Sequence, residues 1–172
     1  MPSSRFDLIP LVLNIVTGQH PESILDIGIG YGKYGALFRE YLDIWDVSKP
    51  YEERKVKLYG VEAFKRYDNP IWQVYDKIYT QDILTLLPLL SELGKFDLLF
   101  MGDVIEHLTK EEGKKILAEI EYDKLIVITP RIVSDQDNVY DNPYEVHKSS
   151  WTIDDFPGFD HFEINNQQIM WN

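Results

Sequence analysis

Apolar and polar positions along the chain follow two alternating patterns. Short runs that are mostly apolar predict strands, and longer segments with apolar residues three or four positions apart predict helices. The predicted strands cover residues 23–27, 56–62, 77–80, 96–101 and 125–129. The predicted helices cover residues 6–17, 34–44, 83–93 and 109–119. Because strands and helices alternate, the pattern predicts a parallel sheet with helices on both faces.

Several of these elements carry their own start and stop signals. Pro10 and Gly18 bracket the first helix, and Thr109 with Glu112 predicts a capping box at the start of the last one. Pro88 lies inside the helical segment 83–93, so this segment is either kinked or divided into two short pieces. Residues 67–73 indicate a short helix or an irregular segment.

The end of the chain follows a different pattern. Residues 152–155 predict a short helix, and two strands at 159–164 and 168–171 flank Asn165-Asn166, a hairpin signal. The fold class predicted is therefore α/β: a Rossmann-like, doubly wound, seven-stranded and mostly parallel sheet with a C-terminal antiparallel hairpin. Polar segments at 46–54 and 131–150 predict loops.

The first predicted strand runs directly into glycines at alternate positions. Gly28, Gly30 and Gly32 follow Asp26, and glycine lets the backbone approach a ligand without a Cβ clash. The order of strand, glycine turn and helix is typical of a nucleotide-binding unit. The next glycine is Gly35, which does not fit the Gly-x-Gly-x-x-Gly spacing of dinucleotide enzymes, and no Lys-Ser/Thr pair follows to grip a nucleoside triphosphate.

Acidic residues stand at the ends of four predicted strands. They are Asp26, Glu62, Asp82 and Asp103. A carboxylate at Glu62 can accept hydrogen bonds from both hydroxyls of a ribose, although a solvated acid at a strand end is the alternative. Asp82 can accept from an adenine amine while the Ile83 backbone meets the ring, or it can cap the helix that follows.

Four motifs in order resemble those of the class I S-adenosylmethionine-dependent methyltransferases. They are 24–32 (ILDIGIGYG), 60–64 (GVEAF), 81–83 (QDI) and 96–108 (FDLLFMGDVIEHL). The resemblance implies a methyltransferase that uses S-adenosylmethionine and releases S-adenosylhomocysteine. It also implies a set of cofactor-binding residues: Asp26, Gly28, Gly30, Tyr31, Gly32, Glu62, Ala63, Asp82, Ile83 and Asp103.

By the same resemblance, each part of the cofactor has its own residues. Asp26, Gly28 and Gly30 would hold the methionyl end, and Glu62 would hold the ribose. Asp82 would hold the adenine, and Asp103 would close the pocket under the cofactor. The whole chain is expected to be one methyltransferase domain, with an N-terminal helix (1–20), a cofactor-binding core (21–130), an acceptor-side loop with a short helix (131–158) and a terminal hairpin (159–172).

Composition bears mainly on the acceptor and the compartment. Seventeen Lys and Arg against 29 Asp and Glu give a net charge of −12, which argues against a large nucleic-acid surface. We therefore expect methyl transfer to O or N of a small-molecule or glycan acceptor, such as a sugar, by a monomer or a homodimer, with nucleic acid an unlikely partner. The chain has no cysteine, and it has no segment typical of a signal peptide or a membrane span. A cytoplasmic protein without a membrane partner is the expectation.

Candidate catalytic residues lie in two segments expected at the same rim of the sheet. Glu106 and His107 follow the strand 96–101, and His147 lies in the loop 131–150. Either histidine can act as a base near neutral pH, or it can hold the local loop structure through a hydrogen bond. Tyr140 and Tyr144 can wall an acceptor pocket or simply pack within the loop. No metal ligand is assigned in this interpretation.

Two alternatives remain open. Residues 103–107 (DVIEH), with His147 and Trp151-Thr152, are similar to the metal-binding pattern of small-RNA terminal 2′-O-methyltransferases, in which acids and two histidines hold a divalent ion. Asp103 stands where that family has Glu, and the net charge suits RNA poorly. The second alternative is a cofactor-binding module without activity of its own.

Overall fold

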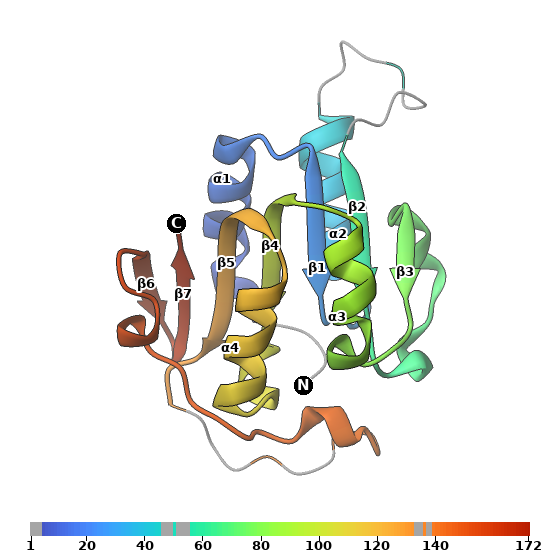
Figure 1. Cartoon of the computed structure of the whole chain (residues 1–172). Helices are drawn as coiled ribbons and strands as arrows, with labels where there is room; N and C mark the ends of the chain where they lie inside the picture. Colours follow the sequence, from blue (N-terminus) through green and yellow to red (C-terminus); the bar gives the residue numbers. More distant parts are fainter. Residues whose placement is uncertain (1–4, 46–49, 51–55, 133–135, 137–138) are drawn as a thin grey trace.

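A computed structural model describes residues 5–45, 50, 56–132, 136 and 139–172. Its centre is a seven-stranded sheet with the strand order β3-β2-β1-β4-β5-β7-β6 (Figure 1). The first five strands pair in parallel, and the last two are antiparallel. The bounds are β1 Ser23–Ile27, β2 Lys57–Val61, β3 Lys77–Tyr79, β4 Phe96–Gly102, β5 Tyr122–Pro130, β6 Asp160–Ile164 and β7 Gln167–Trp171. The predicted Rossmann-like fold class is confirmed.

Four α-helices cover the two faces of this sheet. They are α1 Ile9–Gln19, α2 Lys33–Arg39, α3 Ile83–Glu92 and α4 Lys110–Glu119. α1 and α2 share one apolar core with Leu98 and Phe100 of β4, whereas α3 and α4 share the other with Leu99 and Met101. The run of apolar residues in β4 is thus explained, because successive side chains of the strand enter opposite cores.

Short helical turns extend or replace several of the predicted elements. α1 is preceded by the 3-10 turn Phe6–Leu8, and α2 continues as the π-helical segment Glu40–Ile44. α1 ends at Gln19, with His20 in the left-handed conformation at φ 49°, so Gly18 is not the stop. The remaining 3-10 turns are Lys65–Tyr67, Pro70–Val74, Ile105–His107, Pro143–Glu145 and Ile153–Asp155.

Local sequence signals for a helix start and a hairpin turn agree with the structure. The Thr109 hydroxyl accepts from the Glu112 N–H at 3.2 Å, and the Glu112 carboxylate accepts from the Thr109 N–H at 2.8 Å. Asn165 and Asn166 turn the final hairpin with φ of 48° and 64°. Pro88 lies inside one continuous helix, at an exposed position. Because proline has no backbone N–H, the carbonyl four residues earlier loses its helical hydrogen bond, and an exposed position is where solvent can replace it.

Two loop predictions are only partly described. The polar segment 46–54 lies outside the described residues except for Pro50. The segment 131–150 is irregular where described, apart from the 3-10 turn Pro143–Glu145 and a bridge between Val139 and Asn142. None of the described helices has the length and apolar character needed to cross a membrane.

The strand order reverses between β1 and β4, which opens a crevice at their carboxyl ends. Gly28 follows β1 with φ 73°, and a Cβ placed there would lie 2.2 Å from the Val104 side chain, which follows β4. Only glycine therefore allows the turn after β1 to pack this closely against the chain after β4. The two segments together form the floor of the site.

Candidate functional site

A cavity opens at this crevice and brings most of the predicted cofactor residues together. Those that line it are Asp26, Gly28, Gly30, Tyr31, Glu62, Ala63, Asp82, Ile83 and Asp103. Gly32 is the exception: it caps α2 at φ 85°, and a Cβ placed on it would lie 3.1 Å from the Ile71 side chain. Among the described lining residues, carboxylates clearly outnumber the lysines Lys33 and Lys148. The cavity therefore favours a ligand with positive charge.

Glu62 supports the glycine turn from the end of β2. Its two carboxylate oxygens accept from the N–H groups of Gly30 and Phe64, both at 2.8 Å. The side chain is 6% exposed, and burial raises the pKa of Glu62, opposed by these two hydrogen bonds. A carboxylate oxygen has two acceptor directions, so each can also accept from a ligand hydroxyl.

Asp26 is buried directly beneath the turn. The Tyr75 hydroxyl donates to Asp26 Oδ2 at 2.6 Å, and burial raises the pKa of Asp26 to about 7. Tyr75 fits there because residue 35 is glycine: a Cβ at Gly35 would lie 2.3 Å from the Tyr75 hydroxyl. Tyr75 was not identified from the sequence. A glycine at position 35, in the first turn of α2, was the signal that another side chain packs closely against the helix there.

Asp82 and Asp103 combine structural and cavity-lining positions. Asp82 Oδ1 accepts from the Leu84 N–H at 2.9 Å and so caps α3, while the residue also lines the cavity. Asp103 has φ 54°, which is uncommon for a residue with a side chain, and its N–H donates to the Ile128 carbonyl at 2.9 Å. Burial lowers the pKa of Lys33, which also lines the cavity, against the opposing charge of Asp103.

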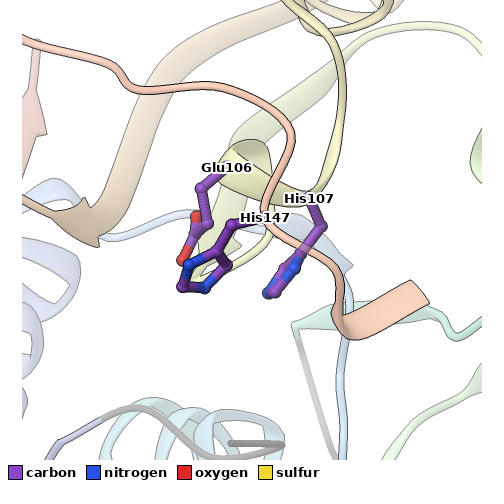
Figure 2. Close-up of side chains that lie close together, drawn as sticks. All are labelled: Glu106, His107 and His147. Carbon is purple, nitrogen blue, oxygen red and sulfur yellow. The ribbon is translucent and has the colours of Figure 1, made fainter. Parts of the chain in front are cut away.

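Three predicted catalytic residues converge beside the cavity. Glu106 and His107 lie on the 3-10 turn after β4, and His147 comes from the loop after β5. One ligand atom from each lies within 4.8 Å of the others, and Figure 2 shows the three side chains close together. The two imidazole rings are 5.0 Å apart between centroids. We call Glu106, His107 and His147 the Glu-His-His cluster.

Hydrogen bonds to the backbone and to Thr129 orient this cluster. Thr129 Oγ1 donates to Glu106 Oε2 at 3.0 Å, and the Glu106 carbonyl accepts from the N–H groups of Lys148 and Ser149. His107 Nδ1 lies 3.3 Å from the Val146 carbonyl. Because a carbonyl only accepts, this contact assigns the proton to Nδ1 and leaves a lone pair on Nε2.

The electrostatics of the cluster follow from its burial. Glu106 is 1% exposed, and burial raises its pKa well above the usual value, with the charge of Asp103 adding to the effect. Burial also lowers the pKa of His107 to about 4. One carboxylate and two imidazoles form a donor set that suits divalent ions such as Mn²⁺, so the residues fit a metal site.

The loop after β5 contributes further residues to the cavity, from the segment 142–148 in which the sequence already placed acceptor-side candidates. Asn142 and Glu145 are buried and line the cavity, where both contact the Tyr67 hydroxyl. Tyr144 lines the cavity and is 41% exposed, as expected for a pocket wall. Tyr140 is 64% exposed and is not among the lining residues.

No protein-family model matches this sequence, and no curated protein does. Solved structures do. The methyltransferase domain of bacterial CtHen1 is 16% identical with a TM-score of 0.57, covering 95% of each chain. A SAM-dependent methyltransferase from Archaeoglobus fulgidus is 15% identical with a TM-score of 0.54, covering 94% of this chain and 92% of that one. The chain therefore has the class I S-adenosylmethionine-dependent methyltransferase fold, as its motifs predict.

A third similar structure corrects the prediction about the acceptor. The small RNA methyltransferase HEN1 is 17% identical with a TM-score of 0.60, covering 99% of this chain and 26% of that one. The expectation of a small-molecule acceptor, with nucleic acid as an unlikely partner, is therefore wrong. The physical fault of this expectation is that net charge describes the whole surface, whereas an acceptor meets only the residues around one site.

Proposed function

We propose that this protein is an S-adenosylmethionine-dependent methyltransferase. The observation that carries the proposal is that one cavity brings together the glycine turn, Asp26 of β1, Glu62 after β2 and Asp82, which caps α3. S-adenosylmethionine, when bound, supplies a methyl group on a positively charged sulfur. The acidic lining complements this charge and the cofactor's ammonium group.

Each residue has a role in holding the cofactor. Gly28 and Gly30 let the backbone approach the methionyl end, and Asp26, held by the Tyr75 hydroxyl, lines the same part of the cavity. Glu62 accepts from the ribose hydroxyls, and Asp82 with the Ile83 backbone faces the adenine. The protein's main contribution to rate is alignment, because a sulfonium transfers its methyl group readily once donor and acceptor are held in line.

Replacing Glu62 with Ala is expected to weaken the binding of S-adenosylhomocysteine at least about tenfold. The variant loses the acceptors for two ribose hydroxyls and also the hydrogen bond that holds the Gly30 N–H. Isothermal titration calorimetry measures the change. Glu119→Ala is the matched control, because this acid lies on α4 and pairs with Lys115 at the surface. Equal affinity in Glu62→Ala and the wild type would remove the ribose assignment.

We further propose that the acceptor is the terminal ribose of an RNA chain and that a divalent ion assists the transfer. The observation that favours this acceptor is the Glu-His-His cluster beside the cavity. A bound divalent ion would orient the two terminal hydroxyls and favour loss of a proton from the one to be methylated. The fold is shared with HEN1 and with the CtHen1 methyltransferase domain, which supports the same acceptor class.

The residues of the cluster have distinct tasks in this proposal. Glu106 would offer a buried carboxylate to the ion, and Thr129 fixes the direction of that carboxylate. His107 points Nε2 away from the Val146 carbonyl and so offers a lone pair. His147, which follows β5 in the chain, would be the third ligand. Neither histidine would have to act as the base, since a divalent ion held by the cluster would itself lower the pKa of the acceptor hydroxyl.

The test is methyl transfer to short single-stranded RNA in the presence of Mn²⁺. Transfer from labelled S-adenosylmethionine is expected to RNA that ends in free 2′- and 3′-hydroxyls. It is expected to fail with the same RNA carrying a 2′-deoxy terminal nucleotide, and to fail with excess chelator. Transfer that is equal to both RNAs would contradict the terminal ribose. Binding of S-adenosylhomocysteine without transfer to any RNA would instead favour a cofactor-binding module.

A further inference from the structure

Tyr67 forms part of the cofactor side of the cavity. It ends the 3-10 turn Lys65–Tyr67, five residues after Glu62, and its side chain is buried. The ring packs against Tyr31 at 5.1 Å and Phe64 at 4.9 Å between centroids. Tyr31 and Tyr67 both line the cavity, and the Phe64 N–H is held by Glu62. A ligand in the cavity therefore restrains the position of the Tyr67 ring.

The hydroxyl of the same side chain reaches the loop after β5. Tyr67 donates to Glu145 Oε1 at 3.0 Å and accepts from Asn142 Nδ2 at 3.1 Å. Asn142 and Glu145 are 2% and 7% exposed, so water competes little for these hydrogen bonds. Burial raises the pKa of Tyr67, which keeps the phenol protonated and able to donate. Buried polar groups joined in this way are costly to separate.

The hydrogen bonds of Tyr67 form one of several attachments that flank His147. Another is at Glu106, whose carbonyl accepts from the N–H groups of Lys148 and Ser149 at 2.8 and 3.1 Å. The His147 N–H also donates to the Gln136 carbonyl at 3.4 Å, and His107 Nδ1 contacts the Val146 carbonyl. The position of the His147 imidazole relative to Glu106 and His107 therefore depends in part on Tyr67, a residue of the cofactor side.

We propose that Tyr67 is a positioning residue that couples the cofactor cavity to the Glu-His-His cluster, so that cofactor and divalent ion bind cooperatively. The inference rests on the proposed function, which assigns the cavity to the cofactor and the Glu-His-His cluster to a metal ion. Coupling of this kind is reciprocal: the cofactor strengthens metal binding by the same factor by which the metal strengthens cofactor binding. It would favour assembly of the acceptor site only when a methyl donor is present.

The experiment measures Mn²⁺ affinity by electron paramagnetic resonance in the wild type and in Tyr67→Phe, each with and without saturating S-adenosylhomocysteine. In the wild type the cofactor product is expected to lower the Mn²⁺ dissociation constant about fivefold or more. Tyr67→Phe keeps the ring contacts but loses both hydrogen bonds of the hydroxyl. Its Mn²⁺ dissociation constant is expected to rise about 10- to 100-fold, and the effect of S-adenosylhomocysteine is expected to disappear.

Tyr122→Phe is the matched control, because it removes a phenol hydroxyl at the amino end of β5, opposite the cavity. It should bind Mn²⁺ as the wild type does.

If Tyr67→Phe also keeps wild-type Mn²⁺ affinity and coupling, the positioning role is overturned while the metal site stands. If the wild type binds S-adenosylhomocysteine but no Mn²⁺, the metal part of the proposed function fails, and this inference fails with it. If Tyr67→Phe does not fold, as judged by thermal melting, the wild type decides: independence of Mn²⁺ and S-adenosylhomocysteine binding overturns the proposal.

Discussion

Replacing Glu106 with Gln is expected to weaken Mn²⁺ binding by at least about 100-fold, because loss of a metal ligand costs more than loss of a residue that only orients one. Methyl transfer to RNA should fall by a similar factor or more. The amide keeps the volume of the carboxylate and can still accept from Thr129 Oγ1, so the local packing is preserved. Only the negative charge and one oxygen are removed.

Two measurements separate this effect from general damage. In the absence of Mn²⁺, S-adenosylhomocysteine affinity should change by less than about threefold in Glu106→Gln, since the residue is not among those that line the cofactor cavity. Glu119→Gln, on the exposed surface of α4, controls for the loss of a carboxylate elsewhere. Wild-type Mn²⁺ affinity in Glu106→Gln would contradict the assignment of this carboxylate to a metal.

Replacing Asp26 with Asn is expected to stabilise the ligand-free protein at pH 8 and to weaken S-adenosylmethionine binding. Asp26 is buried, and burial raises its pKa from 3.8 in the unfolded chain to about 7 in the folded state. Above pH 7 folding must bury a charged carboxylate, which is unfavourable. Asn is neutral, can still accept from the Tyr75 hydroxyl, and avoids this cost.

The pH dependence gives the sign of the effect. The folded state binds the proton of Asp26 more tightly than the unfolded chain does. The contribution of Asp26 to the free energy of unfolding is therefore highest in acid, falls as the pH rises from about 4 to about 7, and is constant above that. Between pH 5 and pH 8, the advantage of Asp26→Asn over the wild type should grow by about 3 kcal/mol.

Urea unfolding at pH 5 and pH 8 measures this difference. Asp123→Asn serves as a control, because that carboxylate is about half exposed and pairs with Lys95 at the surface. It should follow the wild type at both pH values. An advantage of Asp26→Asn that is the same at pH 5 and pH 8 would mean that the carboxyl does not titrate in this range, and the argument from burial would fail.

Hydropathy predicted the elements of the fold well but not all of their lengths. The strand expected at 125–129 extends to Tyr122–Pro130, because Tyr122 and Lys124 pair with Phe96 and Leu98 through the backbone. Those first residues are largely exposed, so a pattern of apolar side chains does not reveal them. The π-helical continuation of α2 also depends on backbone geometry that periodicity does not encode.

Some residues of the candidate site could be predicted from the sequence, and others could not. Residues after β1, β2 and β4 could be brought together from the sequence, because the carboxyl ends of parallel strands meet at one edge of the sheet. Tyr75 and Tyr67 could not, since Tyr67 ends one short 3-10 turn and Tyr75 directly follows another, and neither turn has a repeating pattern. Their partners Asp26 and Glu145 are 49 and 78 residues away in the sequence. Contacts at that separation follow from packing in three dimensions.

The members of the Glu-His-His cluster come from opposite sides of β5 in the chain. Glu106 and His107 precede this strand and His147 follows it, so the cluster can form only once β5 has joined the sheet and the chain has returned across its end. Metal binding would then mark a late step in the maturation of the polypeptide. If a paramagnetic ion is added during refolding, the time at which it binds would show when the last third of the chain has reached its native position.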